Sequence, residues 1–445
     1  MKKSIVLIVS LIFVLGFAAS AFAIHAEIPA ETTAIVAAGT SQITMSGDLR
    51  IRGWFLGNIG KGGVPGKDDQ QAFYDERVRL AVDAASGPVS GRVHLESAPL
   101  GDTTGQKDKY TWGTGLNSKP ATVDILEAWI NYAGSGLLGV PAGIKIGHMP
   151  LALGPATLFF DNTKFGDDAI VAYANPTPNT HLTVLTFKAG ENSIATLHNG
   201  NDLDVYAGIF NGEFASQELG IYYAYLNDPS FGGTPPTMAG GSELSLQDLG
   251  LFGKGNVAGV DYTAEADFQF GKVGGRDASG YGIWLGLGYK LAPVNIRAMF
   301  AYGSGDDGSK DKEKGLVTFL NPGAQYYTLV YDYQVVDAGG SIDDGIANTQ
   351  VYNIGVDITP VDKMKVSLDG YILRANNTET FTFNNGSASK DIGTEVDLKG
   401  TYQLTKNLTY FANVGVLSAG DFYKHQAASE DTTPYVLMHG LEYAF

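Results

Sequence analysis

The chain of 445 residues contains no cysteine, and positively charged residues are in the minority. Without cysteine there can be no disulfide bond and no metal–thiolate site, so other interactions must hold the chain together. There are 30 Lys and Arg against 47 Asp and Glu, which gives a formal net charge of −17. A chain this acidic is a poor partner for nucleic acid, so nucleic-acid binding is not expected.

The N-terminus has the pattern of a secretory signal peptide. Lys2 and Lys3 precede an apolar stretch from Ile5 to Ala18, and Ala21-Phe22-Ala23 forms an A-x-A-like cleavage site. We expect residues 1–23 to be removed. A membrane anchor is the competing interpretation, but the apolar stretch is short and no charged stop follows it. The absence of cysteine excludes lipoprotein anchoring.

Long apolar runs are missing from the rest of the chain. After residue 23 no run of 18 apolar residues occurs, so a transmembrane helix is not expected. The sequence is nevertheless 44% hydrophobic and contains 58 Gly, 23 Tyr and 22 Phe. This composition is typical of a protein built from β-strands.

Apolar and polar residues alternate with a period of two in many segments. In 260–270 (VDYTAEADFQF) every charged residue falls on one face, and 41–55 (SQITMSGDLRIRGWF) behaves in the same way. In 281–289 (YGIWLGLGY) the apolar face carries a tyrosine at each end. Such alternation predicts strands with one apolar and one polar face.

Counting these segments predicts eighteen strands. They lie near 42–56, 73–86, 89–99, 123–132, 142–148, 168–175, 181–190, 202–212, 217–227, 244–253, 258–271, 280–291, 294–304, 350–360, 363–375, 391–403, 407–419 and 434–445. Short connections alternate with long loops, of which 149–167 and 305–349 are two. Strands of about 9–11 residues, even in number and joined alternately by short and long connections, indicate an outer-membrane barrel.

The last five residues, LEYAF, favour a closed barrel over a soluble β-sandwich or β-helix. Leu441, Tyr443 and Phe445 alternate with polar or small residues up to the final atom, where a soluble chain would usually fray. A sheet in lipid must leave no unpaired edge, so the last strand must pair with the first. We therefore predict an all-β fold, a transmembrane antiparallel up-and-down β-barrel over 42–445, preceded by a short periplasmic lead over 24–41.

Several segments resemble the alginate-export family of outer-membrane porins, in order and spacing over most of the chain. They are LRIRGWF (49–55), DERVRLAVD (75–83), LEAWINY (126–132), GIKIGHMPLALG (143–154), LFFDNTKFGDDAIVAY (158–173) and FAYGSGDD (300–307). The resemblance implies an eighteen-stranded barrel and either a general porin or an exporter of an anionic, alginate-like polysaccharide. Relatives tend to carry Arg-Gln where His148-Met149 stand here.

Two groups of charged residues are predicted to face the lumen from opposite sides. We call the first group the basic wall; its members are Arg50, Arg52, Arg77, Arg79 and Arg92. We call the second the acidic wall; its members are Asp261, Glu265 and Asp267. Facing walls of opposite sign would create a transverse field that filters solutes. The alternative is that the arginines pair with neighbours, namely Asp48, Asp83, Glu96 and Glu127, and only hold the wall together.

Two loops invite specific hypotheses. Loop 149–167 is unusually apolar, and it either folds into the barrel as a constriction, with Phe159, Phe160, Asp161 and Asn162 at the narrow point, or packs on a neighbouring loop. Loop 305–349 has an acidic cluster, made of Asp306, Asp307, Asp311, Asp343 and Asp344. It matches no known calcium-loop spacing, so a solvated acidic loop is the favoured interpretation.

The sequence thus predicts an outer-membrane porin of a Gram-negative bacterium that passes small polar solutes passively. We expect no catalytic residues, metal or cofactor, since no motif for them occurs and His94, the histidine placed inside, lies among arginines. Expected partners are membrane lipid and lipopolysaccharide, the barrel assembly machinery acting on the C-terminal strand, and a second copy in a homo-oligomer. A plugged barrel serving as a surface scaffold, an adhesin or a sheath for an electron-transfer protein is the alternative from another class.

Overall fold

The computed structural model describes most of the chain from residue 34 onward. It covers 34–38, 41–59, 65–98, 110–111, 122–136, 139–190, 203–228, 244–319, 327–335, 338, 345–383, 388–424 and 432–445. The predicted signal peptide, most of the predicted lead, and Asp343 and Asp344 lie outside these residues. Within them, no helix is long and apolar enough to cross a membrane.

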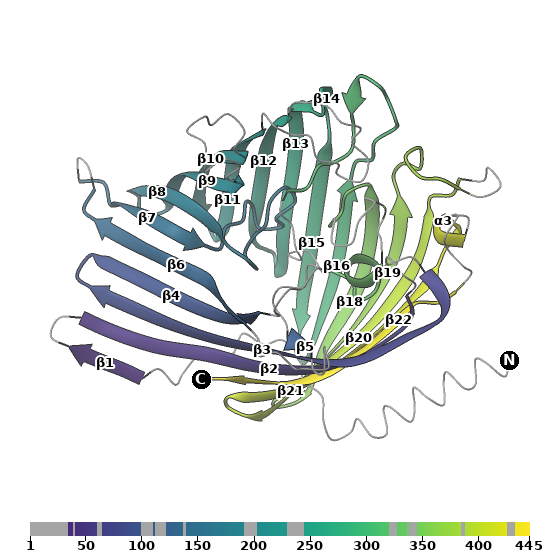
Figure 1. The fold of residues 1–445 in the computed structure, drawn as a ribbon, viewed down its shortest axis with the longest axis horizontal. Helices are drawn as coiled ribbons and strands as arrows, with labels where there is room; N and C mark the ends of the chain where they lie inside the picture. Colours follow the sequence, from purple (N-terminus) through teal and green to yellow (C-terminus); the bar gives the residue numbers. More distant parts are fainter. Residues whose placement is uncertain are drawn as a thin grey trace.

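Eighteen long strands form the sheet over the described ranges (Figure 1). They are β2 (Ser41–Ile59), β3 (Pro65–Ser86), β4 (Val89–Ala98), β6 (Thr122–Gly134), β7 (Ala142–Met149), β8 (Asp167–Thr177), β9 (Thr180–Gly190), β10 (Leu203–Phe214), β11 (Gln217–Asp228), β12 (Leu244–Val257), β13 (Val260–Val273), β15 (Tyr281–Leu291), β16 (Val294–Gly303), β18 (Thr349–Val361), β19 (Met364–Ala375), β20 (Asp391–Thr405), β21 (Leu408–Ala419) and β22 (Tyr435–Ala444). All eighteen strands predicted from the alternation are present in the predicted order.

The remaining elements are short. They are β1 (Ala34–Ala38), β5 (Tyr110–Thr111), β14 (Arg276–Ala278), β17 (Lys312–Glu313), α2 (Tyr331–Gln334) and α3 (Asp421–Lys424). β1 pairs with the first residues of β2, so the lead predicted over 24–41 contains a strand that the sequence did not indicate.

The sheet closes on itself through β2 and β22. Each long strand pairs antiparallel with the next, and β22 returns to β2 with Asp48 opposite Ala444 and Gly57 opposite Tyr435. Figure 1 shows purple β2 lying beside yellow β22. Closure gives every strand two neighbours, so the backbone donors and acceptors are satisfied without water.

The outer face of the barrel is apolar. On β15, Tyr281, Ile283, Leu285, Leu287 and Tyr289 are all exposed, and the same holds for one face of most other strands. An apolar band of this extent is unstable in water, because each square ångström exposed costs about 25 cal/mol. The outer face therefore contacts lipid, and the barrel spans a membrane.

The C-terminus is part of the closed sheet. Phe445 exchanges two backbone hydrogen bonds with Gly47, each 2.9 Å long, and its ring covers Gly47. A Cβ added to Gly47 would lie 2.7 Å from the ring carbon Cζ of Phe445, so a side chain there would displace the ring. The predicted closing residues Leu441 and Tyr443 face outward and are 41% and 45% exposed.

The loop expected over 57–72 is shorter than predicted. β2 continues to Ile59 and β3 begins at Pro65, so the two strands form a hairpin that extends past the end of β22. The alternation that marks a strand in the sequence is lost there, although the strand continues.

Closure can be tested with an engineered disulfide, since the natural chain has no cysteine. Leu49 lies opposite Tyr443 across the seam. Opposed residues of antiparallel strands have Cα atoms about 4.5–5.5 Å apart, within disulfide range. We expect Leu49→Cys/Tyr443→Cys to cross-link under mild oxidation, detected by altered migration on denaturing gels. Leu49→Cys/Leu437→Cys, which are not opposed, is the control; equal cross-linking of both pairs would contradict the closed seam.

Candidate functional site: the lumen and two inward loops

The loop between β7 and β8, residues 150–166, folds into the barrel; we call it the first inward loop. Its apolar side chains pack on lumen-facing residues of β9 to β12, among them Phe187 and Tyr222. Neighbours on the opposite face, such as Val184 and Tyr223, are exposed to lipid, which places the packing inside. The inner face of these strands is mainly apolar where this loop covers it, although Asp248 of β12 is also buried there.

Glu265 of the acidic wall fixes the first inward loop. Its carboxylate accepts hydrogen bonds from the backbone N–H of Ala156 at 2.6 Å and of Leu158 at 3.3 Å. Gly154 has a φ of +72°, and a Cβ there would lie 2.3 Å from the Glu265 oxygens. The turn therefore needs glycine both for its backbone conformation and for the approach of the carboxylate.

The four residues predicted at the narrow point do not line an opening. Phe159 and Phe160 are 0% and 1% exposed, and the Phe160 ring packs 4.9 Å from that of Phe187. Asp161 accepts hydrogen bonds from the backbone and hydroxyl of Thr163, and Asn162 donates one to Asp167. The two phenylalanines lie between the loop and the barrel wall, because burial there removes their apolar surface from water. The two polar side chains hydrogen-bond within the loop and hold its conformation.

The described parts of the chain between β16 and β18, residues 304–319, 327–335, 338 and 345–348, also enter the barrel; we call them the second inward loop. In the described parts, Val330, Tyr331 and Val335 are fully buried. They pack on lumen-facing residues of β18 to β22 and β2, including Leu417 and Trp54. The prediction did not anticipate this, because the segment looks like a polar loop in sequence.

A second carboxylate pair fixes the second inward loop. Glu395 accepts hydrogen bonds from the backbone N–H groups of Leu329, Val330 and Tyr331, at 2.9, 2.7 and 2.9 Å. Asp397 accepts one from Leu329 at 3.1 Å. Glu395 and Asp397 are both 0% exposed and stand two residues apart on β20, as Glu265 and Asp267 do on β13. Two carboxylates at positions i and i+2 of a strand share its lumen-facing side. This spacing is the sequence signal by which Glu395 and Asp397 could have been predicted as supports of an inward loop.

The two inward loops touch each other inside the barrel. Phe319 donates a backbone hydrogen bond of 2.7 Å to Phe159, and the rings of Phe160 and Phe319 stack at 6.0 Å. Leu158 and Leu316 belong to the same buried cluster. Together the loops narrow the lumen from the side of β9–β13 and from the side of β16–β22.

The basic wall on β2, β3 and β4 is paired with carboxylates. Arg52 binds Asp75 through two hydrogen bonds of 2.8 and 2.9 Å. The pairs that the alternative interpretation named are also present: Arg77–Asp48 at 2.7 Å, Arg92–Asp83 at 3.4 Å, Arg92–Glu127 at 3.1 Å, and Arg79–Glu96. We call this set the ion-pair ladder. It lines the inner face with alternating charges of both signs.

The acidic wall is less exposed to the lumen than predicted. Glu265 and Asp267 are buried behind the first inward loop, and Asp267 accepts a hydrogen bond of 2.7 Å from Tyr222. Asp261 lies beside the turn at 258–259, where it pairs with Lys290 at 2.8 Å. Glu265 lies under the loop because its carboxylate satisfies backbone donors that would otherwise be unpaired.

Two members of the acidic cluster in the second inward loop, Asp306 and Asp307, are paired with cations. Asp306 binds Arg276 at 2.9 Å, and Asp307 binds Lys314. Hydrogen bonds from Lys314 and Ser309 lower the pKa of Asp307 to about 2. Among the described residues, no group of three His, Cys, Asp or Glu could hold a metal ion.

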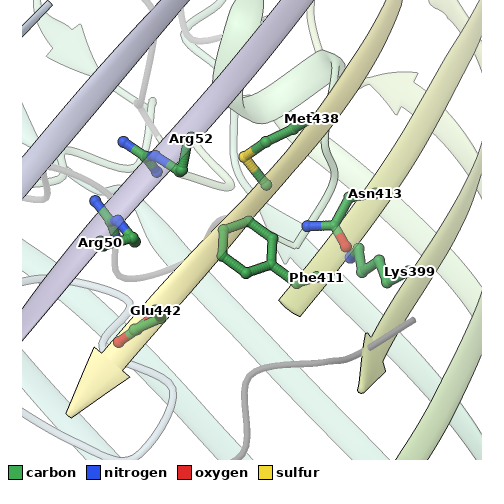
Figure 2. Close-up of a pocket in the computed structure, with 7 residues that line it drawn as sticks. All are labelled: Arg50, Arg52, Lys399, Phe411, Asn413, Met438 and Glu442. Atoms are coloured by element: carbon green, nitrogen blue, oxygen red, sulfur yellow. The ribbon is translucent and has the colours of Figure 1, made fainter. Parts of the chain in front are cut away.

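A pocket of about 180 Å³ opens on the inner face at the closure seam (Figure 2). It contains residues of β2, β20, β21 and β22. Its lining is Arg50, Arg52, Lys399, Phe411, Asn413, Met438 and Glu442. The pocket combines cations, a carboxylate and an apolar floor. Only two members of the basic wall, Arg50 and Arg52, take part in it.

A closed barrel with an apolar exterior, a charged inner face and loops folded inside defines a transmembrane β-barrel of porin architecture. The chain belongs to the family described as Alginate export, which matches residues 41–436. The resemblance inferred from the sequence motifs is thereby confirmed.

Solved structures show the same fold at low identity. The outer membrane protein OpdK from Pseudomonas aeruginosa is 11% identical, with a TM-score of 0.52, over 90% of this chain and 98% of that one. OprD from the same organism is 10% identical, with a TM-score of 0.53, over 90% and 94%. Acinetobacter baumannii OccAB2 is 9% identical, with a TM-score of 0.53, over 90% and 98%. No curated protein matched the sequence.

Removing the carboxylate that holds the second inward loop should widen the lumen. Glu395→Ala deletes three hydrogen bonds from the loop backbone, each worth about 0.5–1.5 kcal/mol, and leaves those N–H groups without that acceptor. We expect a larger single-channel conductance in planar bilayers. Glu379→Ala, an exposed carboxylate in another loop, is the control and should behave like the natural chain. An unchanged conductance of Glu395→Ala would show that the carboxylate does not hold the constriction.

The ion-pair ladder makes opposite predictions for its two partners. Glu96→Gln leaves Arg79 uncompensated and should shift the reversal potential toward anion selectivity, whereas Arg79→Gln should shift it toward cations. An uncompensated charge interacts with a passing monovalent ion 4 Å away by about 1 kcal/mol in water. At low salt this changes the local concentration of that ion about fivefold. The double variant Glu96→Gln/Arg79→Gln should have a reversal potential near that of the natural chain. Lys188→Gln, on the outer face, is the control and should leave the reversal potential unchanged. Shifts of the same sign would refute the pairing.

Proposed function

We propose that this protein is an outer-membrane porin of a Gram-negative bacterium through which small polar solutes diffuse passively. The observation that carries the proposal is the ion-pair ladder on the inner face of β2, β3, β4 and β6. An inner face that only packed against a plug would be apolar, as β9 to β12 are where the first inward loop covers them. The Arg92 and Asp83 side chains of the ladder are 28% and 36% exposed, and charged pairs that water reaches are typical of a wet path.

The chemistry of the lumen favours transport over catalysis. His94, the histidine predicted inside, hydrogen-bonds Glu127 at 2.9 Å, and Glu127 also accepts a hydrogen bond from Trp129. The imidazole is thus part of the wall, and among the described residues its partner is a carboxylate rather than a hydroxyl nucleophile. Export through the signal peptide over 1–23, assembly through the C-terminal strand, contact with lipopolysaccharide and a homo-oligomeric state are parts of the same proposal.

A transverse field between the basic and acidic walls remains a prediction. The ladder and the burial of Glu265 and Asp267 weaken such a field, because the arginines are compensated by neighbouring carboxylates and the two acidic groups do not face the open lumen.

Reconstitution of the purified protein tests the proposal. We expect liposomes that contain it to swell in isotonic solutions of small neutral and charged solutes, and planar bilayers to show a stable open conductance in KCl. Heat-denatured protein is the control. A folded barrel that stays electrically silent would overturn the porin and favour the scaffold, adhesin or sheath function.

Export of an anionic polysaccharide is the second candidate, and membership of the Alginate export family favours it. The same bilayers distinguish it from the porin. A polyuronate exporter should be blocked by short oligouronates at much lower concentration than by neutral oligosaccharides of equal length. Equal block by the two would favour the general porin.

A further inference from the structure

Three carboxyl groups lie on the inner face of β12 and β13, under the first inward loop. Asp248 and Asp267 are 0% exposed, and Glu265 is 2% exposed. Glu265 and Asp267 are two residues apart on β13, and Asp248 is opposite Gln269, the next inward-facing residue of β13. In the described part of the chain, none of the three forms an ion pair with Lys, Arg or His. Three negative charges cannot share such a site, because burial of a charge without a counter-charge is very costly.

Glu265 is the carboxylate whose charge the structure satisfies. It accepts backbone hydrogen bonds from Ala156 and Leu158 of the first inward loop, and the Tyr222 hydroxyl lies 3.5 Å away. An ionised carboxylate is a stronger acceptor for N–H groups than a neutral carboxyl. The negative charge of the cluster therefore belongs to Glu265.

Asp248 and Asp267 lack donors of this kind. One oxygen of Asp267 accepts a hydrogen bond of 2.7 Å from Tyr222, while its other oxygen and both oxygens of Asp248 are buried and accept none. The polar groups beside Asp248 are used elsewhere, since Tyr222 bonds Asp267 and Gln269 exchanges two hydrogen bonds with the backbone of Val317. A buried carboxyl without donors is far more stable when it keeps its proton.

Gly250 allows Tyr222 to close the cluster from the side of β11. The Tyr222 ring lies over Gly250 of β12, where an added Cβ would be 2.1 Å from a ring carbon. The hydroxyl thereby crosses β12 and reaches Asp267 on β13. The ring covers one side of the cluster and the first inward loop covers another, so a proton leaves only when this enclosure opens to water.

Other ionisable groups on the surrounding elements have partners of their own. Residues 315–319 of the second inward loop, beside Gln269, contain no ionisable side chain. On the strands, close to the turns, and on the first inward loop the groups are Glu218 with Lys254 at 2.9 Å, Asp261 with Lys290 at 2.8 Å, Asp161 with Thr163, and Lys164 beside the Phe165 ring. The charge of the cluster is therefore set by its own three carboxyl groups.

We propose that Asp248 and Asp267 form a proton-binding site that keeps the first inward loop against the barrel wall. While both protons are bound, the cluster carries one negative charge, on Glu265, and Glu265 holds the loop. As the pH rises, the two carboxyls release their protons to water and the cluster carries three like charges. Repulsion among these charges and their hydration both favour an arrangement in which the loop leaves the wall. The lumen then widens beside β9–β13, a consequence that rests on the proposed channel.

A single reporter cysteine tests the site, since the natural chain has none. Ala156→Cys places a thiol in the first inward loop, at a residue that is 8% exposed. Its labelling by iodoacetamide is measured on the detergent-solubilised barrel at about pH 6 and at about pH 9.5. Any thiol reacts faster at high pH, so the same reporter in an Asp248→Asn/Asp267→Asn background supplies the reference.

Asparagine keeps the shape and the donor of a protonated aspartic acid but has no proton to lose. We expect equal labelling in the two backgrounds at about pH 6, and at least about tenfold faster labelling of the reporter in the natural background at about pH 9.5. Each single variant, Asp248→Asn or Asp267→Asn, should reduce that ratio. Equal rates at both pH values, or faster labelling of the asparagine background at the lower pH, overturn the proposal.

A matched control replaces an exposed carboxyl outside the cluster. Ala156→Cys/Asp391→Asn should label like the reporter alone at both pH values, because Asp391 lies at the start of β20 in contact with solvent. Folding of every variant is checked by its heat-modifiable migration on gels. A control that loses the pH dependence as fully as the double variant would overturn the assignment to Asp248 and Asp267.

Conductance in planar bilayers over the same pH range separates this inference from the proposed function. We expect the natural chain to conduct more at the higher pH, and the Asp248→Asn/Asp267→Asn barrel to conduct equally at both. A silent barrel that shows the pH-dependent labelling supports the proton-binding site while refuting the porin. A conducting barrel whose labelling ratio does not change with pH supports the porin while refuting the site.

Discussion

The structure depends on one constraint: a backbone surrounded by lipid must find all its hydrogen bonds within itself. The pairing of β2 with β22 satisfies it, because it removes the last two edges of the sheet. The terminal Phe445, bonded twice to Gly47, belongs to that pairing rather than to a free tail. The apolar exterior and the separate polar interior follow, since a closed sheet has only these two faces.

The same constraint acts inside the lumen, on the two inward loops. Loop backbone lying against an apolar wall has donors that no strand can satisfy. Glu265 and Glu395 supply the acceptors, each from the inner face of a strand and each toward consecutive or nearly consecutive N–H groups. Glu265 and Glu395, which resemble parts of an ion filter in the sequence, are therefore mainly structural supports, whereas the members of the ion-pair ladder pair with one another.

The sequence predicts the barrel well because alternation is a local signal that lipid on one side enforces. It predicts the partners of the basic wall as an alternative, since Asp48 and Glu96 lie on neighbouring strands at matching positions. It does not predict the structure where that signal is absent, which is at the ends of β2 and β3 and in the described parts of 304–348. The role of Glu395 depends on contacts with residues about 65 positions away, and alternation within a strand carries no information on such contacts.

The contact between the two inward loops couples their positions. Phe319 is bonded to Phe159, and Phe160 packs on Phe319, so neither loop can leave its place without breaking that junction. A solute that displaces one loop must therefore loosen the other. The aperture of this barrel is therefore set by the two loops together and not by either one alone.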